Sequence, residues 1–405
     1  MSFSLIGKSI KQSATLRLNE IAAILKAKGE PLIHLGGGEP KSKAPIDAIV
    51  GAVSNVNTGE TRYAPADGTR EMKQAVIRYT EEWYGFRPAP ENIVVSSGAK
   101  QAIMVALQAI LDPQDEVVFP APYWVSYPEM VKLCGAIPVP VYPEDGSFLP
   151  TIKDIELHCT SYTKCIMINS PNNPSGALYP PELIAEIVEF CEKKDYWLIM
   201  DDIYHRLVFT GKKWANPWEY VKEYGQNNKM IIINGVSKAY AMTGYRIGWA
   251  VVNKRMWEIM ANIQGHQTSG PSVVLQKAAA AAINGRQSPV EALRVTLENN
   301  TNVMMQQLGA FDGINYVKPD GAFYTFVDFR NYNKNSTQLA EFLLEKVRVA
   351  TVPGVEFGLD GYLRLSTCGS IKEIIEGVER IKWALDPNSP NELYIGERKL
   401  VRDWS

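Results

Sequence analysis

The segment whose residue types most clearly indicate chemistry runs from residue 231 to residue 249. It begins with an apolar run, continues into a polar loop that holds Lys238, and reaches Arg246 where a second apolar run begins. A lysine just past a buried strand suits a Schiff base to a carbonyl cofactor, and a nearby arginine suits a phosphate. Pyridoxal phosphate carries both groups, so we expect this segment to bind it.

Lys238 can act in this way only if part of it is neutral near pH 7. Its pKa must therefore be lowered by burial, by a neighbouring cation or by formation of the imine itself. The alternative is an ordinary surface lysine, which fits poorly because apolar strands are predicted on both sides of the loop.

Two further polar segments follow predicted strands. In one of these segments Asp201 directly follows the predicted strand. Its carboxylate could pair with a pyridinium N–H, which keeps the cofactor ring able to accept electrons. Tyr204, three residues later, and Asn173, in the tight turn at 169–176, could hydrogen-bond the ring's phenolate oxygen. Each segment alone also has a plain structural interpretation, as a solvated acidic pair or as a proline–glycine turn.

Three more segments complete a possible cofactor pocket. Gly98 lies where a strand meets a helix that begins near Lys100, and free N–H groups there would bind a phosphate. Trp124 could stack on a flat ring, and Arg364 in a short strand suits a carboxylate. The alternatives are an ordinary connection, core packing and a structural ion pair. Because ligands bind beyond the carboxyl ends of strands in open α/β sheets, all these segments can converge on one cleft.

Short apolar runs alternate with helical patterns between residues 46 and 290. Five of the runs are predicted to be buried strands, at residues 92–95, 116–119, 165–168, 197–200 and 230–233. Residues 181–191 form a predicted helix with Pro181 in its first turn. This alternation predicts an α/β fold in which helices cover a mostly parallel sheet.

The chain divides into four predicted parts. Residues 1–45 form an arm with one helix, and residues 46–290 form the large domain. Residues 291–385 form a smaller α+β domain, and residues 386–405 are a polar tail to which we assign no role. The predicted elements of the small domain are helices at 291–308 and 337–347 and strands at 321–327 and 361–366.

Composition excludes several classes of function. The 405 residues carry a net charge of −2, from 42 basic and 44 acidic side chains, so neither nucleic acid nor an acidic membrane is an expected partner. No apolar stretch approaches the roughly 20 residues needed to span a bilayer. The five cysteines form no CxxC pair, so we expect no metal site, no disulfide framework and a cytoplasmic protein.

Several of these segments together resemble a known family. They are residues 38–40, 61–65, 122–129, 169–176, 201–204, 237–248 and 364–366. From Gln12 to Leu385 the chain resembles the fold-type I, class I pyridoxal-phosphate-dependent aminotransferases, and among them the bacterial aspartate/prephenate aminotransferase branch. The resemblance implies a large domain with a sheet of the seven-stranded type between helices, a small α+β domain, and a homodimer with shared active sites.

The resemblance also implies roles for individual residues. Lys238 would bind the cofactor covalently and move a proton between the substrate Cα and the cofactor, while Asp201 pairs with the pyridine nitrogen. The other implied cofactor contacts are Asn173 and Tyr204 at the ring oxygen, Trp124 on the ring, and Arg246 with the amides of Gly98, Ala99 and Lys100 at the phosphate. Ser237 is also implied to bind the cofactor, and Tyr63 would reach the phosphate from the partner subunit. The implied substrate contacts are Gly38, Trp124, Asn173, Arg364, Lys100 and Thr15.

The chain departs from the family pattern in two places. Gly235 stands where the family often has a phosphate-binding serine, which puts one hydrogen bond in doubt. The segment 264–270 lacks the arginine that some relatives use for a distal carboxylate. Lys100 and Thr15 suit that carboxylate instead, although Lys100 could also be a surface residue at a helix start.

We therefore expect an aminotransferase with ping-pong kinetics that moves an amino group between aspartate or glutamate and a 2-oxo acid. The main alternative is an aspartate- or glutamate-dependent prephenate aminotransferase. Remoter alternatives are an aromatic- or alanine-type aminotransferase, a C–S lyase or decarboxylase of the same fold, and a non-catalytic cofactor-binding regulator.

Overall fold

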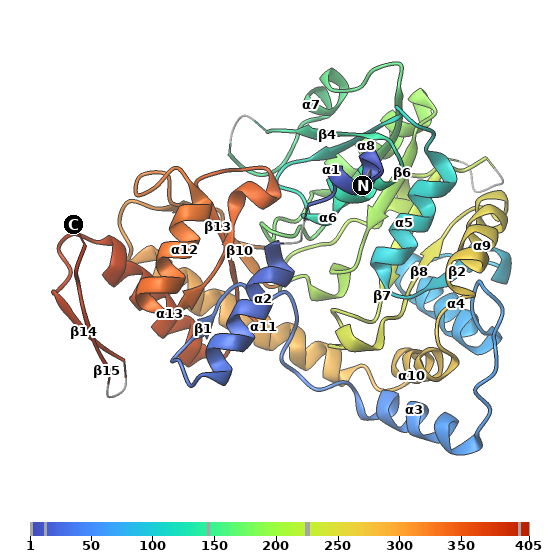
Figure 1. The fold of residues 1–405 in the computed structure, drawn as a ribbon. Coiled ribbons are helices and arrows are strands. Elements are labelled where there is room, and N and C mark those ends of the chain that lie inside the picture. Colours follow the sequence, from blue (N-terminus) through green and yellow to red (C-terminus); the bar gives the residue numbers. More distant parts are fainter. Residues whose placement is uncertain (1–2, 12–13, 144–145, 223–226, 396–397, 405) are drawn as a thin grey trace.

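The computed structural model describes residues 3–11, 14–143, 146–222, 227–395 and 398–404 (Figure 1). Its largest feature is a seven-stranded sheet in the order β2-β8-β7-β6-β5-β3-β4. Its strands are β2 (Ile93–Ser96), β3 (Glu116–Pro120), β4 (Ile137–Val141), β5 (Thr163–Asn169), β6 (Trp197–Asp201), β7 (Met230–Gly235) and β8 (Gly248–Val251). Only β8 runs antiparallel to its neighbours, so the prediction of an α/β fold with a mostly parallel sheet is confirmed.

Helices cover both faces of this sheet, because side chains alternate along each strand. Met230 and Ile232 of β7 pack toward one set of helices, and Ile231 and Ile233 pack toward the other. The first set contains α3 (Ile46–Thr58), α4 (Arg70–Tyr84), α7 (Ile152–Leu157), α8 (Pro181–Lys194) and α10 (Val273–Asn284). The second contains α5 (Ala99–Ile110), α6 (Ser126–Leu133) and α9 (Lys254–Thr268).

A second, four-stranded antiparallel sheet follows in the order β12-β13-β10-β9. Its strands are β9 (Asn315–Tyr316), β10 (Tyr324–Asp328), β12 (Val352–Pro353) and β13 (Tyr362–Ser366). Helices α11 (Ser288–Gly309), α12 (Ser336–Val347) and α13 (Ile371–Leu385) contribute buried apolar residues to the core beside it. Phe326 pairs with Arg364 in register, which fixes Arg364 in the middle strand pair.

The N-terminal segment connects this second sheet to the first. It contains α1 (Leu5–Ser9), α2 (Ala14–Ala27) and β1 (Ile33–His34), and β1 pairs in parallel with β11 (Val349–Ala350). Leu35 is buried in the same core as α13. The following residues, 36–39, therefore run from this core toward the carboxyl ends of the large sheet's strands, where Gly38 and Glu39 line a cavity.

The C-terminal segment, for which the sequence predicted only a polar tail, forms a hairpin of β14 (Glu392–Ile395) and β15 (Arg398–Val401). Leu393, Leu400 and Trp404 pack against the core of the second sheet. The indole Nε1 of Trp404 donates to the Ala384 carbonyl at 3.1 Å, and its ring meets the Trp383 ring edge-on. The segment is thus a structural extension of α13.

No helix within the described ranges combines the length and the apolar character that crossing a membrane requires. Within the same ranges, no three histidine, cysteine or acidic side chains gather in a way that could hold a metal ion.

Candidate active site

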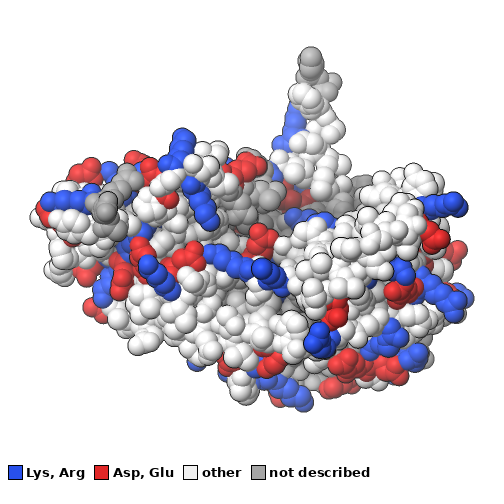
Figure 2. All heavy atoms as spheres, turned by 90° about the horizontal axis from the view of Figure 1, so that it is seen from below, with Lys and Arg blue, Asp and Glu red and all other residues white. Residues whose placement is uncertain are grey.

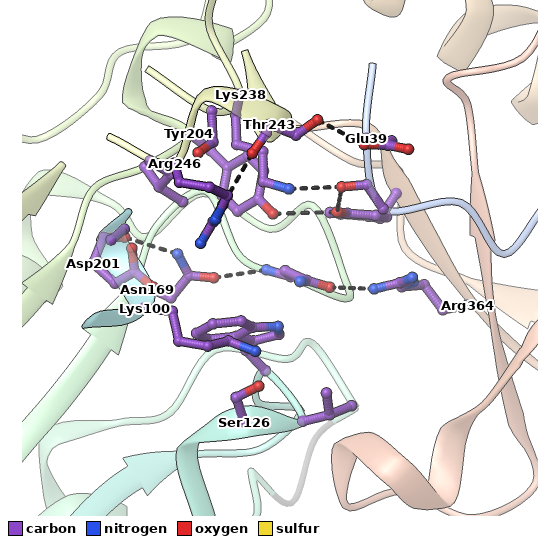
Figure 3. Close-up of a pocket in the computed structure, with 18 residues that line it drawn as sticks. Glu39, Lys100, Ser126, Asn169, Asp201, Tyr204, Lys238, Thr243, Arg246 and Arg364 are labelled. Carbon is purple, nitrogen blue, oxygen red and sulfur yellow. Dashed lines mark hydrogen bonds between the residues drawn. The ribbon is translucent and has the colours of Figure 1, made fainter. Parts of the chain in front are cut away.

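A cavity of about 360 Å³ lies at the carboxyl ends of β5, β6 and β7, where the large sheet meets residues 36–39 and the second sheet (Figure 3). It brings together most residues that the sequence singled out. Its lining includes Gly38, Ala99, Lys100, Trp124, Asn173, Asp201, Tyr204, Ser237, Lys238, Arg246 and Arg364. These residues come from segments far apart in the chain, and the strand ends of one sheet place them together.

Lys238 stands on the loop that follows β7, and it is partly buried. Its ammonium donates a hydrogen bond to the Gly38 carbonyl at 2.6 Å (Figure 3). Burial lowers the pKa of Lys238 to about 8, and the nearby cations Arg364 and Arg246 also lower it. A substantial neutral fraction near pH 7 is the property that an amine needs in order to react with an aldehyde.

Asp201 ends β6 and is buried beside the cavity. Its Oδ2 accepts a hydrogen bond from the Tyr127 hydroxyl at 2.7 Å, whereas within the described residues its buried Oδ1 has no partner. Burial raises the pKa of Asp201 to about 6. A buried carboxylate oxygen without a donor is costly, so this atom suits a cationic N–H donor from a ligand.

The turn after β5 places two amides in sequence between Asp201 and Arg364. Asn169 donates from Nδ2 to the Asp201 carbonyl and accepts the Asn173 backbone N–H, both at 2.8 Å. The Asn173 Oδ1 then accepts Nη1 of Arg364 at 2.9 Å. Figure 3 shows this row of side chains along one side of the cavity. Asn173 is therefore held twice, at its backbone N–H by Asn169 and at its side-chain oxygen by Arg364.

Tyr204, just past β6, lies on the other side of the cavity. Its hydroxyl is 3.2 Å from the Tyr324 hydroxyl of β10, and burial raises the pKa of Tyr204 well above its usual value. Burial also raises the pKa of Tyr324, to about 12, so both phenols remain protonated at neutral pH and can donate hydrogen bonds. The pair suits an anionic oxygen on a ligand ring.

The anion-binding end of the cavity is formed where β2 meets α5. Gly98 precedes α5 with φ of 92°, and a Cβ there would lie 2.5 Å from Nη2 of Arg246. Only glycine permits this approach of the guanidinium to the helix start. Arg246 is anchored by donating to the carbonyls of Thr243, at 3.0 Å, and Ser97, at 3.3 Å. A cation beside free helical N–H groups suits a phosphate.

Arg364 lies at the opposite end and is buried. Its Nη2 donates to the Gly36 carbonyl at 2.9 Å, and its Nε has no hydrogen-bond partner among the residues that the structure describes. The guanidinium carbon lies 4.4 Å from the Tyr324 ring centre and 5.0 Å from that of Phe357. Packing between two rings fixes the plane of the fork, which suits bidentate binding of a carboxylate.

Lys100 and Trp124 form the outer wall. Nζ of Lys100 lies 4.9 Å from the Trp124 ring centre, and burial together with the nearby Arg246 lowers the pKa of Lys100. The lysine is exposed on one side, so it can turn between Trp124 and a second anionic group of a substrate.

Two predicted site residues, one of them expected to act from the partner subunit, are not in the lining of this cavity. Tyr63 does not line this cavity; it is 94% exposed and borders a separate hollow with residues 268–274. Thr15 lies in α2, and its side chain is outside the described part of the structure. Gly235, the departure from the family pattern, has a steric reason: a Cβ there would lie 2.9 Å from the Ile247 carbonyl oxygen.

The structure adds residues that the sequence did not single out. Tyr127 holds Asp201, Tyr324 pairs with Tyr204, and Thr243 donates to Oε2 of Glu39 at 2.6 Å. Tyr127 follows Trp124 by three residues, a spacing that could have placed both on one side of a helix start. We find no sequence signal for Tyr324, because its partner is 120 residues away.

Comparisons with known proteins agree on one family. The family model for aminotransferase class I and II matches residues 30–381. An aspartate aminotransferase of Bacillus subtilis is 37% identical, covering 94% of this chain and 98% of its own length. A probable aspartate/prephenate aminotransferase of Aquifex aeolicus is 36% identical, covering 93% and 97%. The aspartate aminotransferase of Thermus thermophilus with maleate superposes with a TM-score of 0.89 at 34% identity, covering 94% and 99%.

Proposed function

Because the chain belongs to the aminotransferase class I and II family, we propose that it transfers an amino group between a dicarboxylic amino acid and a 2-oxo acid. Aspartate or glutamate gives the amino group, and 2-oxoglutarate or oxaloacetate accepts it. The observation that carries the proposal is the one cavity where three groups meet: Lys238, the buried Arg364, and Oδ1 of Asp201, which has no partner in the described part of the chain. The similar proteins of Bacillus subtilis and Aquifex aeolicus are named aspartate aminotransferase and probable aspartate/prephenate aminotransferase.

The residues present fit pyridoxal phosphate. The unpaired Oδ1 of Asp201 suits its pyridinium N–H, and the phenols of Tyr204 and Tyr324 suit its ring oxygen. Because Gly98 has no side chain, the Arg246 guanidinium lies close to the start of α5, where it suits the cofactor's phosphate. When bound, the cofactor supplies an electron sink for the carbanion that forms at the substrate Cα.

The chain's own residues perform the remaining chemistry. Arg364 holds the substrate α-carboxylate and so sets which bond at Cα is broken. Nζ of Lys238 removes the proton from Cα and returns a proton in the second half of the reaction, for which a pKa near the working pH is favourable. Asn173 is hydrogen-bonded to Asn169 and to Arg364, so it fixes the position of the substrate-binding Arg364 relative to the part of the cavity that would hold the cofactor.

The substrate's second carboxylate is assigned to Lys100. A single rotating ammonium tolerates carboxylates at different distances, which is compatible with aspartate, glutamate and the larger prephenate. Measuring kcat/KM side by side for oxaloacetate, prephenate and phenylpyruvate separates these substrates. A wide preference for phenylpyruvate, which has no second carboxylate, would contradict the assignment of Lys100.

A direct assay tests the reaction class. Incubation of the protein with aspartate and 2-oxoglutarate is expected to yield glutamate and oxaloacetate in equal amounts. Release of ammonia and pyruvate from a thioether amino acid, without glutamate formation, would indicate a C–S lyase and overturn the proposal.

The low pKa of Lys238 predicts how the cofactor-free protein takes up pyridoxal phosphate. Only the neutral amine attacks an aldehyde, so the uptake rate should rise about tenfold per pH unit below a pKa of about 8 and level off above it. Stopped-flow absorbance measures this rate. A rise that continued to the ordinary lysine pKa of about 10.4 would show that Lys238 is not perturbed.

We also propose a homodimer in which Tyr63 of the partner subunit reaches the phosphate. Helix α3 exposes an apolar stripe of Ile46, Ile49, Val50, Val53 and Val56. Figure 2 looks onto the side of the molecule where α3 lies, and uncharged side chains cover a broad part of that face. A contiguous exposed apolar surface of this kind is typical of an interface.

If α3 forms the dimer interface, negative charges introduced on its apolar stripe should separate the two subunits. Replacing both Val50 and Val53 with glutamate should convert the dimer to a monomer, measured by light scattering after gel filtration, and should weaken cofactor binding. The matched control is Leu157→Glu, since Leu157 is an exposed apolar residue on α7. A double variant that stayed dimeric would exclude α3 from the interface.

A further inference from the structure

The two carboxylate oxygens of Asp201 have different surroundings. Oδ2 accepts a hydrogen bond from the Tyr127 hydroxyl at 2.7 Å, and Oδ1 is buried without a partner among the described residues. Asp201 itself lines the cavity, whereas Tyr127 does not. Tyr127 therefore lies behind the carboxylate and leaves one oxygen to a ligand.

The core fixes the Tyr127 hydroxyl in this place. Tyr127 is near the start of α6 and is only 2% exposed. Its ring packs edge-on against Trp124, with ring centres 5.5 Å apart, and against Phe119, with centres 6.0 Å apart. The Tyr127 hydroxyl thus meets Asp201 without needing a ligand to order it.

The charge of Asp201 depends on this contact. Burial raises the pKa of the carboxyl to about 6, and the Tyr127 hydrogen bond is the largest of the effects that oppose burial, followed by the Ile203 N–H and Lys238. A hydrogen bond to an ionised carboxylate is stronger than one to a neutral acid. Without the hydroxyl, a larger fraction of Asp201 would be protonated near pH 7 and could not pair with a pyridinium.

We propose that Tyr127 is a positioning residue that keeps Asp201 ionised for the ring nitrogen of the cofactor, acting through Oδ2 of Asp201. The inference rests on the proposed function, because it requires a pyridine ring in the cavity. It assigns Tyr127, the third aromatic residue of the 122–129 segment, a role distinct from that of Trp124, which lines the cavity.

The test compares two ligands that differ in one ring atom. Dissociation constants are measured for the cofactor-free, full-length protein with pyridoxal phosphate and with its analogue that has carbon in place of the ring nitrogen. Tyr127→Phe should weaken binding of pyridoxal phosphate by about 10- to 100-fold, the cost of an unpaired buried carboxylate oxygen. Binding of the analogue should be unchanged or tighter, because it gains nothing from an ionised Asp201.

Controls separate this role from packing and from the proposed function. Tyr123→Phe removes a hydroxyl from the same segment, but Tyr123 lines a separate hollow together with Glu356 and not the active-site cavity, so both constants should be unchanged. Tyr127→His keeps a ring donor and should restore part of the preference for the nitrogen-containing ligand. An equal loss for both ligands, no loss at all, or no restoration by histidine would overturn the role of Tyr127. Failure of the unchanged protein to bind pyridoxal phosphate would instead overturn the proposed function.

Discussion

Lys238→Ala is expected to lower kcat for transamination by at least about 10⁴-fold, since it removes both the covalent attachment of the cofactor and the proton carrier at Cα. The structure supplies the reason why no other residue substitutes. Lys238 is the cavity-lining lysine that burial brings to a pKa of about 8, whereas Lys100 lies on the exposed outer wall. The variant should also lose the visible absorbance of lysine-bound cofactor.

The control for Lys238→Ala is Lys164→Ala, which removes an exposed lysine near the opposite end of β5. It should retain both absorbance and turnover. Retention of either property by Lys238→Ala itself would be incompatible with the proposed mechanism. Adding a small primary amine should restore part of the activity of Lys238→Ala, because the missing group is an amine and the cavity persists.

The second large effect is expected from Arg364→Leu. The variant leaves the substrate α-carboxylate without its guanidinium in a buried site, which should reduce kcat/KM for aspartate by roughly 30- to 5,000-fold, corresponding to about 2–5 kcal/mol. Arg364→Lys should recover only part of the loss, because an ammonium cannot reproduce the planar fork that Tyr324 and Phe357 enclose.

Amines that lack the α-carboxylate test whether Arg364 acts on that group in particular. The unchanged protein should strongly prefer an amino acid over the corresponding amine, and Arg364→Leu should narrow that preference while cofactor absorbance stays intact. Arg330→Leu serves as the control, since Arg330 is exposed and pairs with Asp328. An unchanged preference in Arg364→Leu would show that the carboxylate binds elsewhere.

Most of the large sheet was predictable from local pattern. The five predicted strands correspond to β2, β3, β5, β6 and β7, because buried parallel strands are continuous apolar runs. β8 corresponds to the apolar run expected after Arg246, but its antiparallel direction was not predicted, because the direction of a strand depends on the loop that precedes it. β4 was not predicted, because it contains Pro138 and Pro140 and is tolerated only at the sheet edge.

The hairpin at residues 392–401 was not predictable in the same way. Its apolar residues form only two short runs, at 393–395 and 400–401, within a segment that is otherwise polar and contains prolines, so composition indicated only a polar tail. Leu393 and Leu400 pair across the hairpin, and the hydrogen bond from Trp404 to the Ala384 carbonyl brings the chain back to the core. The periodicity of a short segment does not reveal a contact of this kind with another part of the fold.

By itself, the sequence determined which reactive groups the protein has and where each stands relative to a strand end. Lys238 and Asp201 could be identified because a charged residue after a continuous apolar run must lie at the edge of a buried sheet. Only the tertiary structure decided which atoms are free and which are held. It placed Tyr127 behind Oδ2 of Asp201, left Oδ1 open, and joined Arg364 to Asn173 across 191 residues of chain. These distances depend on how the two sheets pack against each other, and no local pattern encodes that packing.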